Sequence, residues 1–263
     1  MNKIFTVLLP ALTCALVLCE PPEVVQSKWT DSDVVFDANL GQWKDVLQYP
    51  DDPQFGIGVR NNGAFLYLCL ISWKREINGR LLRNGSTLWF SSASKKGKRF
   101  GIRFPMGMPG NKAAERQGRE RTRDPEELRA KLAESFQEME ILGPEKSDTV
   151  PVKTVVAESF GIVVRAYPSE ENFVYMIKVP LNSDSVNRYA MDIGKDTVVN
   201  VSFESIVPDS GSTPAGGEAT VPPSGGQAGG MSGGGQHMRP SGNEMEEPFS
   251  ESFAIGVSRR PAQ

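Results

Sequence analysis

The chain has 263 residues, enough for one large domain or two small ones, and its hydrophobic fraction of 39% is sufficient to build a core. Its 29 Lys and Arg residues are nearly balanced by 32 Asp and Glu residues, which gives a formal net charge of −3. Because the basic residues are scattered among acids and form no stripe with interleaved aromatic residues, the composition argues against nucleic-acid binding.

Residues 1–19 have the pattern of an export signal peptide. One positive charge at Lys3 precedes an apolar stretch from Ile4 to Leu18. This stretch is short for a membrane span but matches the core of a signal peptide. Two outcomes stay open: cleavage after Cys19, or lipidation of Cys19 as an N-terminal anchor. We therefore expect a secreted, periplasmic or outer-envelope protein, with membrane attachment only through such an anchor.

The body of the chain, residues 20–263, is expected to form a single domain without a disulfide, because Cys69 is its only cysteine. Its first part predicts a short strand at Val34 to Asp37 and a turn at Ala38 to Gly41. A second strand follows at Phe55 to Arg60, and Asn61-Asn62-Gly63 is typical of a hairpin turn into the next strand.

The segment from Ala64 to Phe104 predicts three strands, AFLYLCLISW, NGSTLWFSS and KKGKRFGIRF, with a turn joining the first two. The first strand is apolar at both parities. It is therefore covered on both faces or presents aromatic rings to a ligand, and coverage is the simpler interpretation. In the third strand, Phe100, Ile102 and Phe104 alternate with polar residues or glycine, as in a half-buried strand.

A helix is predicted within an insertion at about 107–138. Asp124-Pro125-Glu126-Glu127 has the features of a helix start, and Leu128, Leu132 and Phe136 share one apolar face. We expect this amphipathic helix to dock on the sandwich, with partner binding as the alternative.

The remaining apolar segments predict further strands at Met139–Leu142, Val150–Val156, Phe160–Ala166, Phe173–Leu181 and Val198–Ile206. Residues 208–248 are rich in Gly, Ser and Pro, and such a segment is expected to be disordered. The alternation resumes at Phe253, Ile255 and Val257, so we interpret the Gly-rich segment as an insertion between two strands. The predicted fold class is all-β, an immunoglobulin-like sandwich with one inserted helix.

No catalytic motif stands out. The only histidine, His237, lies in the Gly-rich insertion, which leaves nucleophilic triads without a base and zinc sites without their main ligand. We therefore predict no enzyme activity and no cofactor. Acids in predicted turns are more typical of turn capping than of a glycosidase pair or a calcium site, so the presence of a metal is left open. These acids are Asp31, Asp33, Asp37, Asp51 and Asp52.

Aromatic side chains are the best candidates for ligand contact, because ring faces pack against the C–H faces of sugars. The chain has four tryptophans, Trp29, Trp43, Trp73 and Trp89. We select Trp73, Tyr67 and Trp43 as candidate ligand-binding residues, with burial in the core as the alternative for each. Trp73 ends a strand beside charged residues and is the best candidate for exposure.

The segments WTDSDVVFDANLGQW, FLYLCL and GSTLWFSSASKKGKRFGIRFP resemble the family nine-like carbohydrate-binding modules and DOMON-like sandwiches of exported proteins, including bacterial ones. The resemblance covers Trp29 to Pro105. It implies an immunoglobulin-like sandwich that binds carbohydrate or, in DOMON relatives, haem. Haem would here depend on methionines, since no ordered histidine is expected. These methionines include Met106, Met108 and Met176.

The sequence therefore favours a secreted or cell-envelope, non-catalytic module that binds a polysaccharide. The alternative is a structural or protein-interaction component of the envelope, in which the Gly-rich insertion is a flexible or adhesive loop. A haem-binding domain is the third hypothesis.

Overall fold

The structure is a computed structural model that describes residues 24–49, 55–92, 100–108, 125–143, 148–206 and 249–261. The predicted signal peptide, the helix cap at Asp124, the acids Asp51 and Asp52 and the Gly-rich insertion with His237 lie outside these residues. Within the described residues, no helix is long and apolar enough to cross a membrane.

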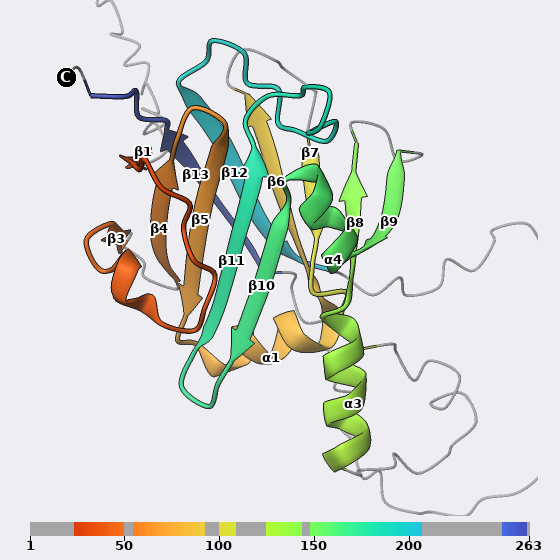
Figure 1. Ribbon diagram of the computed structural model, residues 1–263. Coiled ribbons are helices and arrows are strands. Elements are labelled where there is room, and N and C mark those ends of the chain that lie inside the picture. Colours follow the sequence, from red (N-terminus) through yellow and green to blue (C-terminus); the bar gives the residue numbers. More distant parts are fainter. Residues whose placement is uncertain are drawn as a thin grey trace, which may run out of the picture.

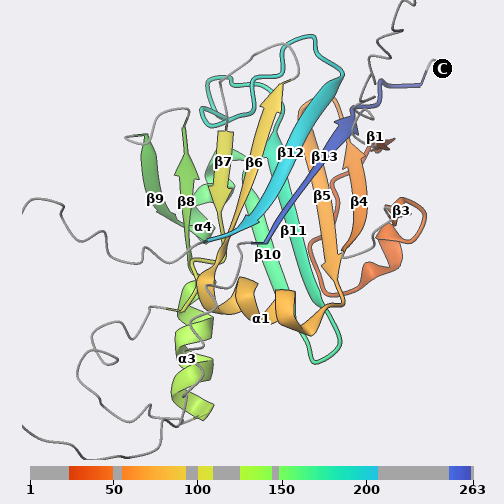
Figure 2. The same ribbon diagram turned by 180° about the vertical axis from the view of Figure 1, so that it is seen from behind.

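Two β-sheets pack face to face (Figure 1), which confirms the prediction of an all-β sandwich. The seven-stranded sheet, seen from its outer side in Figure 2, contains in order β1 (Val24–Gln26), β13 (Ser250–Gly256), β12 (Val198–Ser205), β6 (Ser86–Ser92), β7 (Phe100–Arg103), β8 (Glu138–Leu142) and β9 (Thr149–Lys153). The six-stranded sheet contains β10 (Val163–Pro168), β11 (Phe173–Pro180), β5 (Phe65–Ser72), β4 (Phe55–Asn61) and β2 (Lys28–Trp29), with β3 (Leu47–Gln48) also paired to β4.

Strand β5 is buried on both faces, as predicted. Leu66, Leu68 and Leu70 belong to the main core between the sheets. The opposite parity, which includes Tyr67, Cys69 and Ile71, belongs to a smaller outer cluster, which the segment 30–49 covers with Val34, Trp43 and Val46. Burial raises the pKa of the Cys69 thiol to about 12, so the thiolate that forms disulfides or reacts is strongly disfavoured there.

The predicted strand at Val34 to Asp37 is wrong, because this segment is a loop over the outer face of the six-stranded sheet. The Val35 backbone bonds to the Gln42 side chain instead of to another strand: its N–H donates to Gln42 Oε1 at 3.2 Å, and its carbonyl accepts from Nε2. The predicted turn at Ala38 to Gly41 is partly replaced by a short 3-10 helix, η1 (Leu40–Trp43), for which Asn39 supplies the cap.

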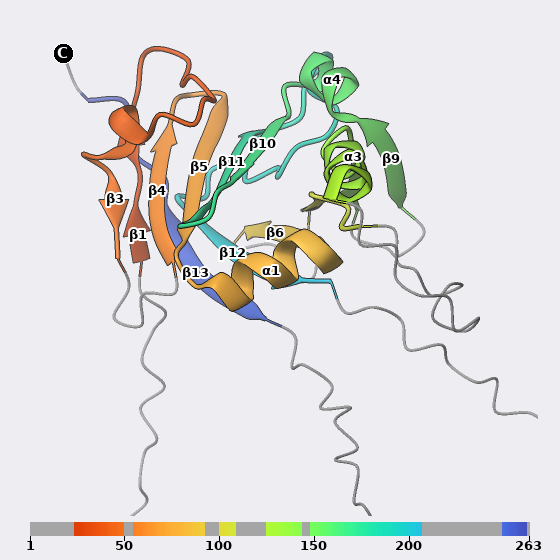
Figure 3. The ribbon, with the colours of Figure 1, turned by 90° about the horizontal axis from the view of Figure 1, so that it is seen from below.

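The predicted turn between the first two strands of the Ala64–Phe104 segment is a helix, α1 (Arg75–Asn84). Ile77 and Leu81, one turn apart, are buried, and Figure 3 shows α1 lying across the lower end of the sandwich. As a result, β5 and β6 do not form a hairpin but belong to different sheets.

The predicted helix of the insertion is present as α3 (Pro125–Ser135) but is not docked on the sandwich. Figures 1 and 2 both show it projecting from the lower end. Leu132 is only half-buried, and the apolar contact is made by Phe136 just after the helix, whose ring centroid lies 5.9 Å from that of Phe104.

Two strand boundaries also differ from the prediction. The segment predicted as one strand from Val150 to Val156 divides into β9 and the short helix α4 (Thr154–Ala157). A 3-10 turn, η2 (Glu158–Phe160), follows, so β10 begins at Val163 and not at Phe160. The α4–η2 segment thus connects β9, at the edge of the seven-stranded sheet, to β10, at the edge of the six-stranded sheet.

The interpretation of the Gly-rich segment as an insertion between strands is confirmed. Its flanking strands, β12 and β13, are antiparallel neighbours with Val199 opposite Ile255 and Val201 opposite Phe253. All four of these side chains face the main core.

Candidate functional site

Trp73 and Tyr49 form an exposed aromatic pair at the lower end of the six-stranded sheet, on its outer face. Tyr49 follows β3 and Trp73 follows β5, and both strands pair with β4. The ring centroids are 5.8 Å apart and the planes are inclined by 36°. Trp73 is 43% exposed and Tyr49 is 58% exposed, so both rings are available to a ligand.

Gly56 of β4 explains why the two rings meet. It lies between the strands that carry them, where a Cβ atom would stand 2.8 Å from the Trp73 ring and 3.2 Å from the Tyr49 ring. Neighbouring strands are about 4.8 Å apart, so rings on either side can close over the central strand only if that strand has no side chain there. Gly58, two residues further along β4, leaves room for the Trp43 ring in the same way.

A hollow of about 430 Å³ lies on the same face, against β10 and β11. Asn172, which lines it, immediately precedes β11, and Trp73 immediately follows β5. Phe173 and Ser72 are register partners, so Asn172 and Trp73 flank the same end of this strand pair. The remaining lining residues are Ala38, Leu40, Ala166, Tyr167, Pro168, Ser169 and Val174.

The two other predicted ligand-binding residues are buried. Trp43 and Tyr67 have 0% exposure in the outer cluster, so neither can stack on a ligand without a change of structure. Both residues therefore follow the alternative interpretation, burial in the core. Of the three candidates, only Trp73 reaches the surface.

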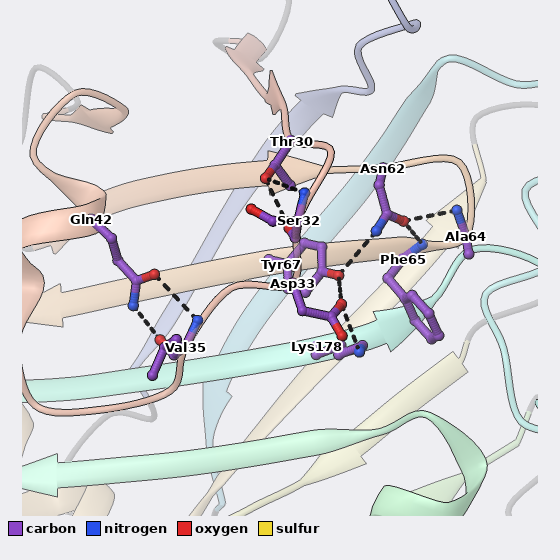
Figure 4. A network of polar contacts seen from close by, with 10 residues as sticks. All are labelled: Thr30, Ser32, Asp33, Val35, Gln42, Asn62, Ala64, Phe65, Tyr67 and Lys178. Atoms are coloured by element: carbon purple, nitrogen blue, oxygen red, sulfur yellow. Dashed lines mark hydrogen bonds and ion pairs between the residues drawn. The ribbon is translucent and has the colours of Figure 1, made fainter.

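Tyr67 does, however, anchor a polar network at the upper end of the outer face (Figure 4). Its hydroxyl donates to Asp33 Oδ1 at 2.6 Å and accepts from Asn62 Nδ2 at 3.1 Å, and Lys178 Nζ lies 3.1 Å from the same Asp33 oxygen. The Tyr67 hydrogen bond and Lys178 hold the pKa of Asp33 below its usual value. Burial, and then Asp33, raises the pKa of Tyr67. The network fastens the 30–36 loop to β5 and β11.

We expect Asp33→Asn to lower the free energy of unfolding at neutral pH by less than about 1 kcal/mol, since the ion pair is solvent-screened. The folded-state pKa of Asp33 is depressed, so its contribution is present above the unfolded-state value of about 3.9 and is lost as pH falls through the folded value. Urea denaturation of both variants at pH 7 and pH 3 should show the difference shrinking in acid.

Asp37→Asn is the matched control, because Asp37 accepts a 3.0 Å bond from the Asn39 N–H that asparagine can also accept. A difference between wild type and Asp33→Asn that stays constant from pH 7 to pH 3 would contradict the assignment.

The remaining tryptophans lie elsewhere. Trp29 is half-buried and donates to Asp31 Oδ1 at 3.0 Å. Trp89, also half-buried, lies on the outer face of the other sheet over Gly101, where a Cβ would stand 2.6 Å from the indole. A smaller hollow of about 210 Å³ adjoins Trp89, with Ser91, Asn200, Ser202 and Ser252 among its lining residues.

The residues named for a metal or haem do not converge. Among the described residues, no group of three or more His, Cys, Asp or Glu side chains is placed to hold a metal ion. Met176 is fully buried in the outer cluster, whereas Met106 and Met108 are half-buried in the segment after β7.

Sequence reasoning missed Tyr49, Gly56 and Asn172. The alternation of Gly56 and Gly58 with Phe55, Ile57 and Val59 was the available indication, because it predicts one bare strand face on which rings can lie.

No protein-family model matches the chain, and no curated protein matches it in sequence. Structure comparison finds a carbohydrate-binding module of family 9 from Caldicellulosiruptor kristjanssonii in complex with glucose, with 6% identity, a TM-score of 0.35, and coverage of 70% of this chain and 78% of that one. The complex of such a module with cellotriose gives 6% identity, a TM-score of 0.34, and coverage of 70% and 76%. Both are modules of the family that the Trp29–Pro105 segment resembles, but likeness at this level carries no conclusion about what this chain binds.

Proposed function

We propose that this protein is an exported, non-catalytic module that binds carbohydrate at the Tyr49–Trp73 pair. The observation that carries the proposal is the exposure of two adjoining rings over a strand glycine, on a face that also carries a hollow. An apolar ring left in water at one end of a sheet is well suited to the C–H face of a sugar.

Polar groups for sugar hydroxyls are present on the same face, in the hollow. The Asn172 side-chain oxygen accepts a 3.1 Å bond from the Ser169 hydroxyl. Its Nδ2 has no acceptor among the residues that the structure describes, so it is available as a donor to a ligand. A ring platform with one or two directed amide or hydroxyl groups provides both affinity and orientation.

A glycan array, followed by affinity electrophoresis in gels that contain each polysaccharide bound on the array, tests the proposal. Trp73→Ala should weaken binding at least about thirtyfold, because loss of a central aromatic contact costs about 2 kcal/mol or more. Its effect on stability should be smaller than that of removing a fully buried ring, since Trp73 is 43% exposed.

Trp89→Ala is the matched control, a tryptophan on the opposite sheet, and it should leave binding unchanged. Loss of binding in Trp89→Ala with retention in Trp73→Ala would assign the glycan to the other hollow. Absence of binding to every polysaccharide by the wild type would exclude the carbohydrate function and favour a protein-interaction role in the envelope.

Export is a separate part of the proposal and rests on the pattern of residues 1–19. Mass spectrometry of the mature N-terminus distinguishes removal after Cys19 from lipidation of Cys19.

A further inference from the structure

We infer that the ligand is an uncharged oligosaccharide chain, bound at two subsites, and not a single sugar. This inference rests on the proposed carbohydrate function and specifies its ligand. The first subsite is the Tyr49–Trp73 pair, and the second is the hollow lined by Ala38, Leu40, Tyr167 and Asn172.

The two subsites are separated across the strands of the six-stranded sheet. The ring pair lies over Gly56 of β4, and the hollow lies against Val174 of β11, with β5 between them. Two strand spacings amount to about 10 Å, which is wider than one sugar ring. A single sugar can therefore occupy one subsite only, whereas a chain that crosses β4, β5 and β11 can occupy both.

The lining of the hollow favours an uncharged ligand. None of its lining residues is ionisable at neutral pH, and its polar groups are the Tyr167 and Ser169 hydroxyls and the Asn172 amide. Desolvating a charged sugar against such a surface without an opposite charge is costly, whereas neutral hydroxyl groups find suitable partners.

The walls of the hollow are held in place by the protein itself. The Tyr167 hydroxyl donates to the Phe36 carbonyl at 2.7 Å and so connects β10 to the 36–40 loop that forms the facing wall. Ala38 in that wall is exposed, which leaves space above it. The second subsite is thus formed before a ligand arrives, which lowers the cost of binding.

Isothermal titration with cello-, xylo- and malto-oligosaccharides, from the monosaccharide to the hexasaccharide, tests the inference. Affinity for the sugar type that binds should rise at least about tenfold with chain length, which corresponds to 1.4 kcal/mol from the second subsite. Ala38→Trp, which narrows the hollow, should reduce this rise and should change the affinity for the shortest bound ligand much less. Trp73→Ala should weaken ligands of every length.

Val35→Trp is the matched control, because Val35 is an exposed residue of the same loop that does not line the hollow. Equal wild-type affinity for short and long ligands would overturn the two-subsite inference while leaving carbohydrate binding intact. The two-subsite inference would also be overturned if Ala38→Trp lowered the affinity for ligands of all lengths equally. If no glycan binds the wild type, either in the titration or on the array, the proposed function itself is excluded.

Discussion

Phe203→Ala is expected to lower the free energy of unfolding by about 3–5 kcal/mol, the range for removing a fully buried aromatic side chain. Phe203 is 1% exposed and lies at the centre of the main core. Its ring centroid is 5.7 Å from that of Phe55, 5.4 Å from Tyr175 and 6.1 Å from Phe249. Residues of β4, of β11 and of the segment just before β13 therefore lose contacts together.

The cavity left by this substitution cannot collapse easily, because its walls are strands of both sheets that are held in register by backbone hydrogen bonds. Urea denaturation followed by tryptophan fluorescence measures the loss. Phe36→Ala is the matched control: Phe36 is only partly buried and packs on the outer cluster, so its loss should be clearly smaller. Equal losses for the two variants would contradict the placement of the main core.

Gly85→Ala is expected to cost about 3–5 kcal/mol, because strain and overlap add. Gly85 ends α1 with φ +82° and ψ 178°, a conformation that is essentially restricted to glycine. A Cβ there would stand 2.5 Å from the Pro105 carbonyl oxygen and 2.9 Å from the Gly107 nitrogen. Both contacts are backbone atoms, so relief would require the 105–107 segment to move away from the end of α1.

Gly194→Ala isolates the conformational part of this cost. Gly194 has φ +63°, in the left-handed region, but a Cβ there meets nothing within 4 Å. Its replacement should cost only about 1–2 kcal/mol. Denaturation of both variants under the same conditions measures the difference. Equal costs would mean that the backbone around Gly85 is looser than the structure indicates.

The inner face of most strands could be predicted from local patterns. Alternation in Phe100–Phe104 and in Val199–Phe203 identifies the side chains that enter the core, because a strand has only two faces. Apolar residues at both parities of β5 similarly predicted that it is covered on both sides, although part of the covering segment, Val34 to Asp37, was itself predicted as a strand.

Helices α1 and α3 show where local patterns were insufficient to predict the structure. Residues 75–84 contain Asn78-Gly79 and four charged residues, which favour a turn, whereas packing of Ile77 and Leu81 beneath the sheets stabilises α1. The 125–135 segment has a good helical pattern but projects from the sandwich, because an apolar face specifies burial without specifying a partner.

By itself, the sequence determined the fold class, the insertion between β12 and β13, and the exposure of Trp73, since each depends on residues that are neighbours in the chain. Only the tertiary structure decided that Trp43 and Tyr67 are buried, that Trp73 has Tyr49 beside it, and that the hollow with Asn172 lies on the same face. These contacts depend on the order β3–β4–β5 and on the placement of the 30–49 loop, and strand order is set by long-range packing that a local pattern does not contain.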